Sequence, residues 1–104
     1  MSLHDIQHQT HDWISQYKEG YWPPHEIMAQ MTEEMGEIAR EVNHAFGMKK
    51  KKATEAENSI SNELGDLLFN MSCLANSLGI DLDASFAHTM HKVNTRDKDR
   101  FAKK

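Results

Sequence analysis

The sequence predicts an all-α fold with four helices. Apolar side chains recur three or four residues apart in four segments, and no stretch shows the apolar and polar alternation of a half-buried strand. The sequence contains no internal repeat. At 104 residues and 12.0 kDa, the chain is expected to form a single domain over residues 1–104. Because only 38% of its residues are hydrophobic, we expect a partner chain to complete the core.

The first helix is predicted over residues 3–18. Within this segment Ile6, Trp13 and Tyr17 recur at helical spacing and define one face. Gly20 follows shortly afterwards and is expected to stop the helix.

A second helix is predicted over residues 24–46. Pro23 or Pro24 suits its first turn, and Gly47 suits its end. Methionine, isoleucine and valine side chains share one face, which we expect to pack in the core. Four glutamates fall within an arc of about 100° on the other side: Glu33, Glu34, Glu37 and Glu41. Taken alone, such an acidic face is more often simply the solvated side of an amphipathic helix.

The third helix is predicted over residues 55–78. It follows residues 48–54, which include four consecutive lysines and are expected to form a loop. No residue from 67 to 80 is charged, so we expect this helix to be buried nearly all round. Gly79 is expected to end it.

A fourth helix is predicted to begin at Asp81 or Asp83, either of which can act as its N-cap. Its apolar side is expected to carry Phe86, Met90, Val93 and Phe101. A cationic stripe flanks that side, with each member four residues from the next: Lys92, Arg96 and Arg100.

The carboxylates of the second and third helices predict a cation site. Glu63 and Asp66 lie at one end of the uncharged segment, where unpaired carboxylates are costly, and no Lys or Arg occurs between Lys52 and Lys92. A hard divalent cation would neutralise four ligands: Glu34, Glu37, Glu63 and Asp66. An all-oxygen set favours Mg²⁺, with Mn²⁺ as a possible substitute, over zinc.

The net charge, the single cysteine and the lack of a long apolar run limit the binding partners and the cell compartment that we expect. The formal net charge of −4 and the isoelectric point of about 5.9 argue against nucleic acid or an acidic membrane as the main partner. The single cysteine, Cys73, excludes an internal disulfide framework. The first residues show no basic and apolar signal, and the longest uncharged run carries too many Asn and Ser to span a bilayer. We therefore expect a cytoplasmic protein that binds neither nucleic acid nor a membrane.

A carboxylate-bound cation predicts polyphosphate hydrolysis, because phosphate oxygens are the hard ligands that fill its open positions. Glu33 is a candidate to orient or deprotonate the attacking water. The remaining phosphate oxygens would contact the cationic stripe of Lys92, Arg96 and Arg100.

The junction of the first two helices is the candidate base site. Tyr21 and Trp22, beside Lys18, would stack on a nucleobase. An equally open interpretation is that the two aromatic side chains are buried where the helices join and only fill space there.

The two acidic motifs together resemble a known family. Glu33-Glu34-Met35-Gly36-Glu37 and Glu63-Leu64-Gly65-Asp66 are similar to the signature of the MazG-like, all-α nucleoside triphosphate pyrophosphohydrolases. The resemblance spans essentially the whole chain and is closest to the short single-domain bacterial members. It implies a four-helix bundle completed by dimerisation, as a homodimer or homotetramer.

The resemblance also implies an activity and a set of roles. The activity is Mg²⁺-dependent cleavage between the α and β phosphates of a nucleoside triphosphate, which releases a monophosphate and pyrophosphate. Nucleotide-pool house-cleaning is the role expected from this activity. The metal ligands would be Glu34, Glu37, Glu63 and Asp66. Lys92 and Arg96 would serve the phosphates. Asn70 stands where some relatives carry an aromatic residue that faces the base, which leaves the base preference open.

Other interpretations stay open at this point. A di-iron carboxylate bundle would need two Glu-x-x-His units, and the sequence supplies one, Glu41 to His44. A non-catalytic helical interaction module would present the same acids as a solvated face. The histidines are loosely spaced along the chain, so we expect them to lie at exposed polar positions rather than to form a zinc site.

Overall fold

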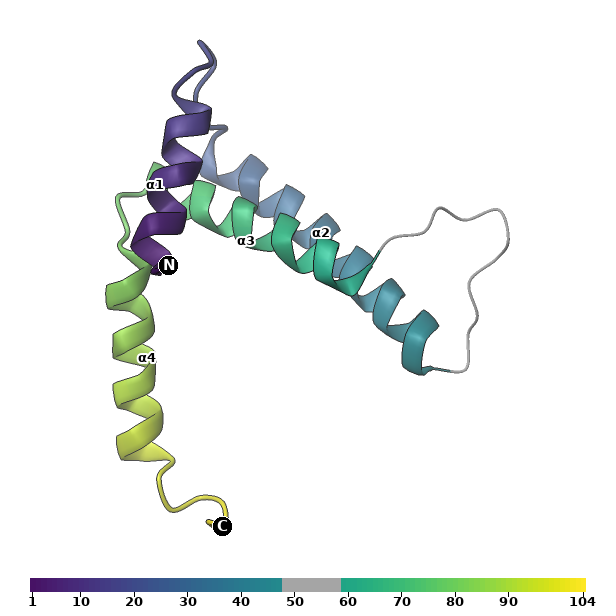
Figure 1. Ribbon diagram of the computed structural model, residues 1–104, viewed down its shortest axis with the longest axis vertical. Coiled ribbons are helices and arrows are strands. Elements are labelled where there is room, and N and C mark those ends of the chain that lie inside the picture. Colours follow the sequence, from purple (N-terminus) through teal and green to yellow (C-terminus); the bar gives the residue numbers. More distant parts are fainter. Residues whose placement is uncertain (48–58) are drawn as a thin grey trace.

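Two antiparallel helices form the centre of the molecule. The computed structural model describes residues 1–47 and 59–104, and these residues form four helices and no strand, which confirms the all-α prediction. The helices are α1 (Leu3–Ile14), α2 (Pro24–Phe46), α3 (Ile60–Ser77) and α4 (Leu82–Arg96). Helices α2 and α3 lie side by side, α1 packs on α3, and α4 extends away from the pair (Figure 1).

Polar side chains fix where three of the helices begin. Ser2 Oγ accepts a hydrogen bond at 3.0 Å from the backbone N–H of Asp5, whose carboxylate accepts one at 2.9 Å from the backbone N–H of Ser2. Ser59 caps α3 and Asp81 caps α4, each by accepting from a backbone N–H of the following turn. Such a cap is typically worth about 1 kcal/mol.

Two predicted helix boundaries are wrong. Helix α1 ends at Ile14 rather than at residue 18, because the chain then makes tight turns in which the N–H of Tyr17 bonds the carbonyl of Ile14 and that of Gly20 bonds Tyr17. Helix α3 begins at Ile60, because Ser59, which was predicted to be helical, is extended, with φ −102° and ψ 151°. Residues 55–58, also predicted to be helical, lie outside the described residues. The loop predicted for residues 48–54 lies outside the described residues.

The connection between α3 and α4 is a glycine-terminated stop, as predicted. Gly79 has φ +68°, a left-handed conformation that residues with a Cβ rarely adopt, and the N–H of Ile80 donates to the carbonyl of Ala75 at 2.8 Å. At its other end α4 stops at Arg96. The helical stripe and apolar side predicted to run on through Arg100 and Phe101 are therefore shorter than expected.

Asp83 fastens α4 to α1. Its two carboxylate oxygens accept hydrogen bonds, each at 3.1 Å, from the backbone N–H groups of Leu3 and His4 in the first turn of α1. Asp83 was one of two candidates for the N-cap of its own helix. In the structure Asp81 takes that role, and Asp83 caps the neighbouring helix instead.

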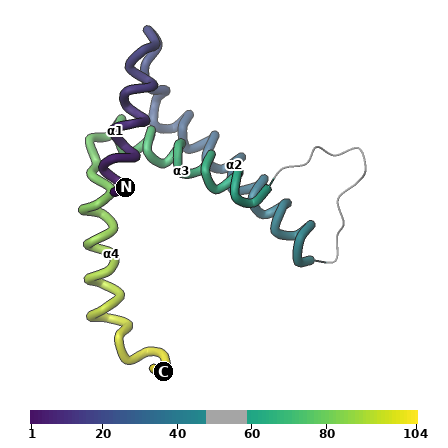
Figure 2. Tube along the Cα trace, in the orientation of Figure 1, coloured from purple at the N-terminus to yellow at the C-terminus, as the bar shows by residue number. Residues whose placement is uncertain are grey.

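The core within one chain is thin. Among the described residues, the buried apolar side chains are Ile27, Cys73 and Ala75. The Cα radius of gyration is 17.2 Å, whereas a compact domain of this length has about 13 Å. The Cα trace likewise shows α4 standing apart from the α2 and α3 pair (Figure 2).

The prediction that the third helix is buried nearly all round is wrong for the single chain. Leu64 is 51% exposed, Phe69 38% and Met71 37%. The reason is that α2 and α1 are the helices that pack on α3, and they leave part of its apolar surface uncovered.

Candidate metal centre

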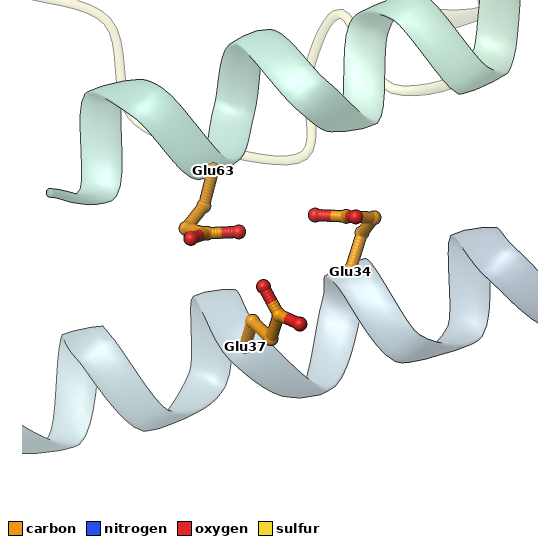
Figure 3. A group of neighbouring side chains, drawn as sticks. All are labelled: Glu34, Glu37 and Glu63. Carbon is orange, nitrogen blue, oxygen red and sulfur yellow. The ribbon is translucent and has the colours of Figure 1, made fainter. Parts of the chain in front are cut away.

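Three carboxylates from two helices converge. Glu34 and Glu37 on α2 and Glu63 on α3 point toward one another across the helix pair (Figure 3). One oxygen from each lies within 4.8 Å of the others. Glu34 is 7% exposed and Glu63 is 4% exposed, so two of the three acids are buried.

Local geometry explains the convergence. Glu34 and Glu37 are three residues apart and therefore neighbours on one face of α2. Glu63 lies in the first turn of α3, and the packing of α3 along α2 brings that turn opposite the same face. This arrangement agrees with the predicted meeting of the two acidic motifs.

Crowding perturbs the protonation of the cluster. A hydrogen bond with Glu37, followed by burial and a hydrogen bond with Glu34, raises the pKa of Glu63 to about 7 from an ordinary value of 4.5. Repulsion by the same two carboxylates adds to the rise in pKa. The crowding therefore favours the protonated form of Glu63.

The carboxylate oxygens of this cluster are suited to bind a metal cation. Glu34 Oε2 and Glu63 Oε2 are buried and have no hydrogen-bond partner among the described residues. Gln30 Nε2 donates to Glu34 Oε1 at 3.2 Å, so Oε2 is the oxygen of Glu34 that is left without a donor among those residues. Buried carboxylate oxygens without donors are costly, and a hard divalent ion accepts such oxygens as ligands.

The other predicted acids lie outside this three-residue cluster. Asp66, one turn further along α3, is exposed and lines a pocket together with Glu34. Glu33, the predicted base, is exposed on α2. Of the four predicted metal ligands, Glu34, Glu37 and Glu63 are brought together, and Asp66 lies at the edge of the adjoining pocket.

This aromatic pocket has a volume of about 470 Å³ and extends from the acids to the connection between α1 and α2. Five of its lining residues are aromatic: Trp13, Tyr17, Tyr21, Trp22 and Phe69. The Trp13 ring meets the Phe69 ring edge-on, with centroids 5.9 Å apart. Asn70 also lines the pocket, and its Nδ2 donates to the carbonyl of Asp66 at 3.0 Å. Aromatic walls beside carboxylates suit a ligand with a flat apolar part and a cation-bound polar part.

Three of the four predicted base-site residues, Tyr21, Trp22 and Asn70, line this aromatic pocket, and Lys18 does not. Trp13, Tyr17 and Phe69 were not predicted at this site, because Trp13 and Tyr17 were assigned to the apolar face of the first helix and Phe69 to an uncharged segment expected to be buried nearly all round. Gln30 was not predicted either, although it lies one turn before Glu34 on the same face of α2.

The cationic residues lie apart from the acids within one chain. Lys92 and Arg96 are exposed on α4, which packs chiefly on α1 and points away from the α2 and α3 pair (Figure 1). Arg96 Nη2 lies 3.2 Å from Asp97 Oδ2, and Arg100 Nη1 lies 3.8 Å from Asp97 Oδ1. The described chain does not bring these side chains to the three-carboxylate cluster.

An all-helical chain with crowded acids beside an aromatic pocket fits the class of nucleotide-cleaving hydrolases. The model of the MazG nucleotide pyrophosphohydrolase domain matches residues 23–101, and the chain belongs to this family of enzymes. The matched range includes the three clustered carboxylates, Asp66 and all of α4.

Relatives extend this result over nearly the whole chain. The sequence is 53% identical over 103 residues to the uncharacterized protein YpjD of Bacillus subtilis (strain 168), covering 99% of this chain and 93% of that protein. The crystal structure of YpjD from Bacillus subtilis matches with a TM-score of 0.82 and 52% identity, over 91% of this chain and 97% of the other. A Bacillus-conserved MazG protein, described as a nucleotide pyrophosphohydrolase, matches with a TM-score of 0.80 and 50% identity, over 95% and 96%.

None of the helices in the described part of the chain combines the length and the apolar character needed to cross a membrane.

Proposed function

We propose that this enzyme is a Mg²⁺-dependent nucleoside triphosphate pyrophosphohydrolase that cleaves the bond between the α and β phosphates of ribo- or deoxyribonucleotides. The products are a nucleoside monophosphate and pyrophosphate. The observation that carries the proposal is the pair of buried oxygens, Glu34 Oε2 and Glu63 Oε2, that have no hydrogen-bond partner among the described residues, together with the aromatic pocket that Glu34 also lines. The resemblance of the two acidic motifs supports the same activity.

The metal would be held by Glu34, Glu37 and Glu63, with Asp66 completing the set from the next turn of α3. Carboxylate oxygens suit Mg²⁺, with Mn²⁺ as a substitute. Bound at this position, the metal supplies Lewis-acid stabilisation of phosphoryl oxygens and a more acidic water. Glu33, which is exposed on α2, would orient or deprotonate the attacking water.

The nucleoside would occupy the aromatic pocket. Tyr21 and Trp22 would stack on the base, and Asn70 would hydrogen-bond its edge. In this pose the phosphates face Glu34 and Asp66, which lie at the acidic side of the same pocket. Lys18, outside the lining, would contact the distal phosphates or the solvent side of the substrate.

A second copy of the chain would supply the basic side chains that contact the phosphates. Lys92, Arg96 and Arg100 are remote from the acids of their own chain, so we propose that α4 of one chain serves the site of another in a homodimer or homotetramer. The extended shape and exposed apolar side chains support this assembly: Phe86 is 57% exposed, and Met90 and Val93 are each 40% exposed. A cytoplasmic location and a house-cleaning role in the nucleotide pool are part of the proposal.

A panel of ribo- and deoxyribonucleoside triphosphates with Mg²⁺, scored for pyrophosphate against orthophosphate, tests the proposal. Pyrophosphate release is expected from wild type, and Glu63→Gln is expected to lower it by at least about 100-fold because it removes a ligand charge. Glu26→Gln, an exposed acid on the same helix as Glu34, is the matched control and is expected to keep full activity. Orthophosphate as the primary product, or an unaffected Glu63→Gln enzyme, would contradict the proposal.

A further inference from the structure

A network of partly buried hydrogen bonds from side-chain amides joins α1, α3 and the start of α4. Gln7 on α1 is 7% exposed. Its Nε2 donates to Asn76 Oδ1 at 2.9 Å and to the carbonyl of Ile80 at 2.8 Å, and its Oε1 accepts from the backbone N–H of Leu82 at 2.8 Å. Both protons of this amide are used, so its orientation is defined by its partners.

Asn76 on α3 continues the network toward the aromatic pocket. Its Nδ2 donates to the backbone carbonyl of Gln7 at 2.9 Å and to the hydroxyl of Tyr21 at 3.0 Å. The hydroxyl of Tyr21 also lies 2.8 Å from His11 Nδ1, and the two rings stack with centroids 5.8 Å apart. Tyr21 is thus tied to both α1 and α3.

Tyr21 forms part of the wall of the aromatic pocket, so the hydrogen bonds to its hydroxyl group influence the shape of that wall. Tyr21 belongs to the connection between α1 and α2, which also contributes Tyr17, Gly20 and Trp22 to the pocket wall. Asn76 does not line the aromatic pocket. Any influence of Asn76 on a ligand in that pocket must therefore pass through another residue, and Tyr21 is its hydrogen-bond partner there.

We infer that Asn76 is a positioning residue for the nucleoside: by fixing the hydroxyl of Tyr21, it sets the position of the pocket wall against which the base stacks. The inference rests on the proposed function, because that function places the nucleoside in the aromatic pocket. Gln7 and Asn76 also hold the chain at the start of α4, so one network sets both the pocket wall and the base of the helix that carries Lys92 and Arg96.

A double-mutant cycle with Asn76→Ala and Tyr21→Phe tests this role. Each single variant is expected to raise the KM for a nucleoside triphosphate by about two- to tenfold, the effect of one lost hydrogen bond, with kcat within about twofold of wild type. Because both changes break the same bond, the double variant is expected to show no higher KM than the weaker-binding single variant. Gln9→Ala is the matched control, since Gln9 is exposed on the same helix as Gln7.

Effects on KM that multiply in the double variant would overturn the inference, because they would mean that Tyr21 and Asn76 act independently. A loss confined to kcat would overturn it as well. If Asn76→Ala does not fold, Asn76→Asp replaces it in the cycle, since it keeps the acceptor for Gln7 and removes both donors.

Hydrogen exchange separates this inference from the proposed function. The backbone amides of residues 15–22 are expected to exchange faster in Asn76→Ala than in wild type or Gln9→Ala, whether or not the enzyme turns over. If wild type releases no pyrophosphate while this exchange increases, the proposed function fails and the anchoring of Tyr21 stands. Unchanged exchange together with an unchanged KM would refute the positioning role in an active enzyme.

Discussion

The carboxyl groups of Glu63 and Glu37, on different helices, bring one oxygen each within 4.8 Å of the other, and a proton on Glu63 lets the two groups attract rather than repel each other. That proton and a divalent cation are alternative ways of relieving the same repulsion. The state of the cluster is therefore expected to depend on both pH and metal concentration.

Without metal, the stability of the protein is expected to fall as pH rises from about 4.5 to about 7. The folded-state pKa of Glu63 is raised to about 7 from 4.5, so in this window the native state binds more protons than the unfolded state. The Glu63 contribution is fully present below the unfolded pKa and is lost as pH passes the folded one. Urea unfolding in a chelator at pH 5 and pH 8 measures it, and Glu63→Gln should lose this part of the pH dependence.

Mg²⁺ is expected to stabilise the fold more at pH 8 than at pH 5.5. Metal binding requires ionised Glu63, so the ion must displace the proton that the crowded carboxylates retain below about pH 7. Thermal melts with and without Mg²⁺ give the shift, and calorimetry in two buffers of different ionisation enthalpy counts the protons released. A shift that is equal at both pH values would place the ion elsewhere.

Nucleotide binding is expected to change tryptophan fluorescence. The chain has two tryptophans, and both Trp13 and Trp22 line the aromatic pocket. A stacked base should quench their emission even without turnover, for example when Ca²⁺ replaces Mg²⁺. Trp22→Phe should retain only the part of the signal that comes from Trp13. Saturating nucleotide with no change in emission would argue against this pocket as the nucleoside site.

Two inactive variants are expected to complement each other. Glu63→Gln lacks a metal ligand, and Arg96→Ala lacks a phosphate contact that we assign to the neighbouring chain. In an equimolar dimer mixture, heterodimers are half of the population and carry one intact site of two, so activity should recover to about a quarter of wild type. If both residues serve a site within one chain, mixing would restore nothing.

Asp83→Ala is expected to destabilise the protein by about 1–2 kcal/mol. The substitution removes the acceptor for the N–H groups of Leu3 and His4 at the start of α1. Denaturant unfolding at fixed protein concentration measures the loss. Asp99→Ala, an exposed acid beyond α4, should change the free energy of unfolding by less than about 0.5 kcal/mol.

Local patterns predicted most of the fold and the centre of the site. Helical spacing, proline and glycine placement and capping residues are read within a few positions of the chain, and they indicated four helices and the stop at Gly79. The charges of Glu34, Glu37 and Glu63 also indicated their convergence, because unpaired acids next to an uncharged segment need a counter-charge, and one cation between the two helices is the simplest source of it.

Long-range contacts escaped the same reasoning. Asp83 and Leu3 are 80 positions apart, and Gln7 and Asn76 are 69 apart, so no local rule connects them. The exposure of Leu64 and Met71 also depends on which helices cover α3, a property of packing rather than of spacing. For the same reason the stripe of Lys92 and Arg96 was recognised, but its distance from the acids of its own chain was not.

Because few apolar side chains are buried within one chain, the concentration of the protein is expected to influence how much of it is folded. If association supplies most of the missing burial, folding and assembly are a single equilibrium, and simple dilution acts as a denaturant. The amount of enzyme present then governs not only how fast substrate is consumed but also what fraction of the chains is folded at all.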